Sequence, residues 1–103
     1  MGNWLRAQWF ARDGEQGWRD SVDREVLMTR GSVGICDVTT LGKIDIQGRD
    51  AGEFLNRVYC NGFATLAVGK VRYGLMLRED GIAYDDGTTA RMGENHYVMT
   101  TTT

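Results

Sequence analysis

The chain has few of the residues from which metal centres and disulfide scaffolds are built. It contains two cysteines and one histidine among its 103 residues. Cys36 and Cys60 are not spaced as a CxxC pair, and His96 stands at no recognisable metal-ligand spacing from either of them. We therefore expect two buried or half-buried thiols and a histidine within a strand, with no metal site and no disulfide framework.

Long apolar runs, dense basic clusters and nucleotide-binding glycine patterns are absent as well. No apolar run approaches the ~20 residues of a membrane-spanning helix, and no signal-peptide core is visible. The formal net charge of −2 comes without a dense basic run, which argues against a nucleic-acid surface. No GxGxxG or P-loop spacing occurs. The sequence thus predicts a cytoplasmic protein with neither a membrane nor a nucleic-acid partner.

The composition of 42% hydrophobic and 25% charged residues is that of one globular domain.

Residues 1–15 show no sustained helical or strand periodicity of apolar residues, and we interpret them as an aromatic arm that packs onto another surface. Its large aromatic side chains are Trp4, Trp9 and Phe10. Apolar residues recur every four positions across residues 16–30, which predicts a helix. The apolar run 33–38 predicts a buried strand or extended segment, within a domain that covers residues 16–103.

The middle of the chain is predicted to hold one strand and a second helix. Residues 43–47 alternate between polar and apolar side chains, which predicts a strand with Ile44 and Ile46 facing inward. Asp50–Glu53 has the capping-box pattern, an acidic N-cap residue with a glutamate three positions later, and so it opens a helix. The side of that helix expected to face inward consists of Phe54, Leu55, Val58 and Tyr59.

The last third of the chain is predicted to be an antiparallel meander. Strand-like runs at 71–77, 82–92 and 96–103 are separated by turn signals at Arg78–Gly81 and Gly93–Asn95. The order of the elements therefore predicts an α+β fold, with two helices and an antiparallel β-meander.

The threonine run at the end of the last strand has a separate consequence. Thr100–Thr103 strongly favours β-structure, and nothing follows it that would cover a sheet edge. We expect an unpaired edge there that invites self-association, and a chain that is a fragment of a longer protein.

Two adjacent carboxylates, Asp85 and Asp86, form the main candidate for chemistry. Neighbouring residues of a strand point to opposite faces, so one carboxylate should face inward or into a cleft while the other faces solvent. A carboxylate held in a cleft can accept a proton or a ligand N–H. A solvated turn or a pair that caps backbone N–H groups is the alternative. A divalent cation is a further alternative, although the sequence places no third ligand.

Several segments, taken in order and spacing, resemble the folate-binding aminomethyltransferase family that the glycine cleavage T-protein typifies. The resemblance is strongest to the branch of this family found in hetero-oligomeric sarcosine oxidases, and it covers nearly the whole chain. The segments that carry it are Ser21–Leu27, Gly34–Ile44, Phe54–Asn56, Tyr73–Leu77 and Gly81–Gly87.

The resemblance implies a set of folate-contacting residues. Asp86 matches the acidic residue that meets the reactive nitrogens of tetrahydrofolate, and Tyr73 matches a tyrosine near the folate. Leu41 replaces a methionine that packs on the pterin. Thr40 replaces a histidine, and Gly87 stands where the family usually has a bulky apolar residue. Both departures suit the sarcosine oxidase branch.

The resemblance also implies an activity. The full-length parent would capture the methylene unit released by sarcosine oxidation on tetrahydrofolate, forming 5,10-methylene-tetrahydrofolate, with Asp86 as the catalytic base. FAD, FMN and NAD would bind in other parts of the parent complex, which contains further subunits, and the isolated fragment would be inactive. A non-catalytic folate-binding or subunit-scaffolding module is the alternative.

Overall fold

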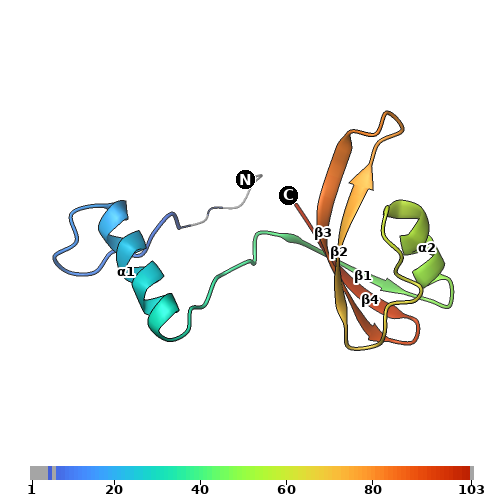
Figure 1. Ribbon diagram of the computed structural model, residues 1–103, viewed down its shortest axis with the longest axis horizontal. Helices are drawn as coiled ribbons and strands as arrows, with labels where there is room; N and C mark the ends of the chain where they lie inside the picture. Colours follow the sequence, from blue (N-terminus) through green and yellow to red (C-terminus); the bar gives the residue numbers. More distant parts are fainter. Residues whose placement is uncertain (1–4, 6, 103) are drawn as a thin grey trace. The chain divides into compact units, whose positions relative to one another are not determined.

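The computed structural model describes residue 5 and residues 7–102, in two compact units, Met1–Thr40 and Leu41–Thr103 (Figure 1). Trp4 of the expected arm lies outside the described residues. None of the helices among the described residues is long and apolar enough to cross a membrane.

The first unit is organised around helix α1 (Trp18–Gly31), which confirms the predicted first helix. The carboxylate of Glu15, just before the helix, accepts hydrogen bonds from the Arg24 guanidinium at 2.5 Å and the Ser21 hydroxyl at 2.5 Å. It also accepts one from the backbone N–H of Arg12 at 2.9 Å. These bonds lower the pKa of Glu15 to about 2, with the Arg24 bond as the largest cause. The carboxylate thereby holds the chain before α1 against the first turns of the helix.

The apolar segment 33–38 does not form the buried strand predicted for it, whereas the extended segment named as the alternative stays a prediction. The described residues of the first unit contain no strand, so this unit supplies no strand with which the run could pair. The side chains of Val33 and Ile35 are 84% and 103% exposed. Cys36 is exposed in the same segment and Cys60 is exposed in the second unit, so the expectation of buried or half-buried thiols is wrong. An apolar run predicts a tendency to be buried but does not supply the surface that buries it.

The second unit is a four-stranded antiparallel sheet with helix α2 (Ala51–Val58) on one face (Figure 1). The strands stand in the order β1-β4-β3-β2. Their bounds are β1 (Gly42–Gln47), β2 (Val71–Leu77), β3 (Ala83–Gly93) and β4 (His96–Thr101). The α+β class, the second helix and the β2-β3-β4 meander are therefore confirmed.

The position of β4 corrects the expectation of an exposed threonine edge. β4 lies between β1 and β3, and Thr100 and Thr101 pair with Lys43 and Gly42 of β1. The outer strands of the sheet are β1 and β2 instead. Thr103 lies outside the described residues. The last strand of this unit pairs with the first one. Strand propensity alone does not predict such a long-range pairing.

Helix α2 begins without the predicted capping box. The Asp50 side chain makes no capping hydrogen bond, because its backbone (φ −97°, ψ 5°) is not in the extended conformation typical of an N-cap. Glu53 pairs with the Arg57 guanidinium at 3.0 Å, one turn later in the helix. The capping-box motif therefore predicted where the helix begins, but the contacts expected of it are not made.

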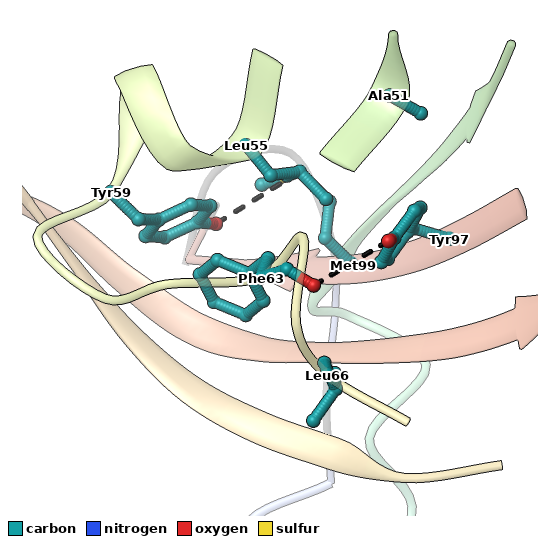
Figure 2. Packing of buried hydrophobic residues seen from close by; sticks show 7 residues of the cluster. All are labelled: Ala51, Leu55, Tyr59, Phe63, Leu66, Tyr97 and Met99. Carbon is teal, nitrogen blue, oxygen red and sulfur yellow. Dashed lines mark hydrogen bonds between the residues drawn. The ribbon is translucent and has the colours of Figure 1, made fainter. Parts of the chain in front are cut away.

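The hydrophobic core lies between α2, the following loop and the sheet (Figure 2). Its buried members are Ala51, Leu55, Tyr59, Phe63, Leu66, Tyr97 and Met99. Leu55 and Tyr59 are buried as predicted, but Phe54 of the same expected apolar side is 52% exposed. On β1, Ile46 packs partly against the core, and Ile44, which pairs with Met99, lies on the same face as predicted but is 46% exposed.

Two aromatic rings of the core occupy the space above a glycine of β2. The rings of Tyr59 and Phe63 lie 5.1 Å apart between centroids, at an interplanar angle of 56°. A Cβ atom on Gly74 would lie 2.7 Å from a Tyr59 ring carbon and 2.9 Å from a Phe63 ring carbon. The aromatic pair therefore seats on β2 only because residue 74 has no side chain.

We expect Gly74→Ala to destabilise the second unit by about 1–3 kcal/mol, since the added methyl group overpacks the core. Chemical denaturation of the chain measures the change. Gly62→Ala is the matched control, because a Cβ there meets nothing closer than 4.0 Å. Equal unfolding midpoints for the two variants would contradict this account of the core.

The Glu15 cluster predicts an acid-dependent loss of structure in the first unit. Its folded-state pKa of about 2 lies below the ordinary value of 4.5, so its contribution to stability is complete above pH 4.5. That contribution is lost as the pH falls toward 2. We expect Glu15→Gln to remove this part of the pH dependence of helix content, measured by far-UV circular dichroism. Glu25→Gln, at a more exposed partner of Arg24, is the control and should retain it.

Candidate functional site

The β2–β3 hairpin places the two adjacent carboxylates on opposite faces of the sheet. A turn joins the strands, with the Arg78 N–H donating to the Ile82 carbonyl oxygen at 2.8 Å and Gly81 at a φ of +81°. Beyond an irregularity in the register, Met76 stands opposite Asp85 and Leu75 stands opposite Asp86. This alternation confirms that the two carboxylates point in opposite directions, as strand geometry predicts.

Asp86 lies on the face of the sheet away from α2 and is paired with Tyr73. The Tyr73 hydroxyl donates a hydrogen bond to Oδ2 of Asp86, and the Tyr73 side chain is 57% exposed. This bond, followed by desolvation, raises the pKa of Tyr73 above its ordinary value. At neutral pH the tyrosine therefore keeps its proton and directs it at the carboxylate.

Asp85 lies on the opposite face and is engaged by the end of β4. Its Oδ1 atom accepts hydrogen bonds from the Thr102 hydroxyl, from the Thr102 N–H at 3.3 Å and from the Asp86 N–H at 2.8 Å. The Thr102 hydroxyl is the largest cause of a lowered Asp85 pKa. The carboxylate is thus ionised at neutral pH and joins the ends of β3 and β4.

An apolar groove of about 520 Å³ runs beside Asp85 on the α2 side of the sheet. Its walls come from β1, α2 and the three other strands, and include Ile44, Phe54, Met76 and Met99. Because Asp85 faces this groove while Asp86 faces away from it, the two carboxylates serve different surfaces.

Gly87 lies where β3 separates from β4. A Cβ atom on Gly87 would overlap the carbonyl oxygen of Thr100. At this point the Thr88 N–H donates to the Thr100 hydroxyl oxygen at 2.9 Å. The bulky residue usual for the resembled family does not fit this backbone arrangement, so the local path of β4 accounts for Gly87.

The structure brings together only two of the four folate-contacting residues inferred from the sequence. Tyr73 and Asp86 are in direct contact, whereas Leu41 precedes β1, which β4 separates from β3. Thr40 belongs to the first unit, whereas the other three residues belong to the second. Contacts of Thr40 and Leu41 with a pterin remain predictions.

His96 lies in β4, as predicted, and pairs with Asp45 on the surface of the sheet. Its Nε2 atom lies 2.6 Å from Oδ1 of Asp45 on the neighbouring strand. In the part of the chain that the structure describes, no group of three or more histidine, cysteine or acidic side chains is placed to hold a metal ion.

Comparisons with known proteins agree on one family. Residues 1–103 match the model of the GCVT N-terminal domain. The chain is 66% identical over 102 residues to a sarcosine oxidase subunit alpha of Rhizobium meliloti (strain 1021), covering 99% of this chain and 10% of that protein. It is 52% identical over 103 residues to the same subunit of Corynebacterium sp. (strain P-1), again covering 10% of it. The chain thus spans about a tenth of the length of these relatives.

Proteins named aminomethyltransferase are more distant relatives. That of Pseudothermotoga lettingae is 35% identical over 79 residues, which cover 77% of this chain and 22% of that protein. The crystal structure of the glycine cleavage system aminomethyltransferase T from Bartonella henselae matches with a TM-score of 0.61 and 27% identity, over 64% of this chain and 18% of that one. With a family model that covers every residue, the chain belongs to the GCVT N-terminal domain family.

Proposed function

We propose that this chain is part of a sarcosine oxidase alpha subunit and supplies part of its tetrahydrofolate site. The full-length protein would transfer the methylene unit from sarcosine oxidation to tetrahydrofolate and so form 5,10-methylene-tetrahydrofolate. Identities of 66% and 52% to subunits of that name support the assignment of the parent. The family membership of the chain supports the use of folate.

The contact between Tyr73 and Asp86 is the observation that carries this proposal. Through this contact the Tyr73 hydroxyl holds the Asp86 carboxylate on the face of the sheet away from α2, where Asp86 is partly exposed. Tetrahydrofolate, when bound, supplies the nitrogen atoms that capture the one-carbon unit. An ionised carboxylate fits this ligand, because it accepts hydrogen bonds from ring and amino N–H groups.

Asp86 would act in two ways. It would orient a ligand N–H and then accept the proton that leaves when the nitrogen forms its new bond to carbon. A positioned general base contributes roughly 10²–10⁴-fold to a rate, and the fixed orientation adds a proximity effect. Tyr73 would keep the carboxylate in place and offer an aromatic face to the edge of the pterin.

The remaining parts of the proposed site lie outside this pair. Thr40 and Leu41 would pack on the pterin, and residues of the longer polypeptide would complete the pocket. We assign oxidation of the amine, with FAD, FMN and NAD, to other parts of a cytoplasmic complex that includes further subunits. The isolated chain would therefore have little or no activity.

A non-catalytic folate-binding or subunit-scaffolding module is the second candidate. Thr40 in place of the family histidine favours it, because a group that could assist proton transfer is missing at that position. The two candidates differ in rate. A scaffold would yield 5,10-methylene-tetrahydrofolate no faster than free formaldehyde reacts with tetrahydrofolate in solution.

We expect Asp86→Asn in the full-length enzyme to lower the rate of 5,10-methylene-tetrahydrofolate formation by roughly 10²–10⁴-fold, because the amide cannot accept the proton. Sarcosine oxidation, measured in the same assay by amine consumption, should be unchanged. Asp80→Asn, in the exposed turn of the same hairpin, is the control. An unchanged rate of product formation in Asp86→Asn would rule out the catalytic role.

The hydrogen bond between Tyr73 and Asp86 predicts a raised Tyr73 pKa that can be measured at alkaline pH. The raised pKa of Tyr73 means that its contribution to stability is present below the ordinary value of about 10 and is lost as the pH rises through the folded-state value. We expect Asp86→Asn to lower the pKa of Tyr73, measured by carbon-13 NMR of the tyrosine rings. Tyr73→Phe identifies the resonance. A pKa unaffected by Asp86→Asn would show that the two side chains are not coupled.

A further inference from the structure

A third polar side chain, Thr88, shares the face of the sheet that carries Tyr73 and Asp86. Thr88 stands directly opposite Tyr73 in the β2–β3 register and two residues after Asp86 on β3. Its Cα atom is therefore about 7 Å from that of Asp86, with both side chains on the face away from α2. Its side chain is exposed, and the apolar residues Leu75 and Ala90 lie on the same face.

The hydrogen-bond partners of Thr88 determine what its hydroxyl can offer a ligand. The Thr100 hydroxyl oxygen accepts a hydrogen bond from the Thr88 N–H at 2.9 Å. The same Thr100 hydroxyl donates its one proton to the Thr88 carbonyl oxygen at 3.3 Å. The two hydroxyl oxygens are 3.1 Å apart. Since the Thr100 proton is already used, the Thr88 hydroxyl is the donor in that contact. Its remaining lone pairs, which are acceptors, are left for a ligand.

The protons of the neighbouring pair, Tyr73 and Asp86, can be counted in the same way. Tyr73 uses its only proton on Asp86, and an ionised carboxylate has no proton to donate. Tyr73, Asp86 and Thr88 therefore each present hydrogen-bond acceptors outward. Such a surface favours a ligand edge with at least two N–H donors several ångströms apart, whereas a ring nitrogen that carries a lone pair gains no hydrogen bond from these acceptors.

We propose that Thr88 is a further binding residue of this site and that, with Asp86, it selects a reduced pteridine ring over an oxidised one. The inference rests on the proposed function, because it concerns the same folate site. Reduction adds N–H donors at N5 and N8, whereas the oxidised ring has lone pairs at both positions. Thr88 accepts one of these ring N–H groups, and Asp86 accepts another donor of the same ligand.

Anaerobic calorimetric titration of the full-length polypeptide with tetrahydrofolate and with folic acid tests the proposal. We expect Thr88→Val to weaken tetrahydrofolate binding about two- to tenfold, the value of one hydrogen bond, and to leave folic acid binding unchanged. Thr88→Ser, which keeps the hydroxyl, should restore the wild-type affinity for tetrahydrofolate. Thr101→Val, which removes a hydroxyl from the groove on the opposite face, is the matched control and should bind both ligands as the wild type does.

The outcomes separate this inference from the function on which it rests. If the wild type and Asp86→Asn differ in tetrahydrofolate affinity while Thr88→Val binds as the wild type does, the folate site stands and the role of Thr88 is refuted. If Thr88→Val weakens both ligands equally, selection by the ring N–H donors is refuted. If the wild-type polypeptide does not bind tetrahydrofolate, the proposed function and this inference both fail.

Discussion

The seating of two aromatic rings on a glycine is the contact on which the second unit depends. Tyr59 and Phe63 fill the space above Gly74, so the face of β2 that carries Gly74 must turn toward α2. Tyr73 precedes Gly74 in the same strand and therefore faces the other way. The packing of the core thus determines which side of the sheet carries the tyrosine of the candidate site, although no core residue belongs to that site.

Adjacent aspartates take different roles for the same geometric reason. Asp85 is directed toward the α2 side, where Thr102 holds it and where its carboxylate joins two strands. Asp86 is directed toward the open face, where its carboxylate accepts a hydrogen bond from the hydroxyl of Tyr73. A single strand therefore supplies one carboxylate to the fold and one to a surface that can accept ligand protons.

Local patterns in the sequence predicted much of this architecture. The alternation of β2, the turn at Arg78–Gly81 and the opposite directions of Asp85 and Asp86 all follow from contacts close in sequence, and all are present. The family resemblance predicted that Tyr73 and Asp86 both lie near a folate, but it did not predict their direct contact, which only the structure reveals. Thr88 was missed, although its position two residues after Asp86 already placed it on the same face.

The predictions that failed depend on partners distant in sequence. The threonine run was expected at an edge, but Thr100 and Thr101 pair with Lys43 and Gly42 at the start of the same unit, which the propensity of the run itself does not reveal. The segment 33–38 was expected to be buried, but its own unit offers no strand among the described residues. Likewise, Ile44 and Phe54 have the right spacing for a core yet line an open groove.

The sequence by itself determined which segments form helices, strands and turns, and how side chains alternate along each strand. These features depend on backbone geometry over a few residues. Tertiary structure alone decided which strands became neighbours, which face α2 covers and which hydroxyl protons are already used. Those outcomes depend on side chains that meet only after the chain has folded. The alternation of Tyr73 with Gly74 and of Asp85 with Asp86 is local, but the packing of the core decides which of the two faces stays open.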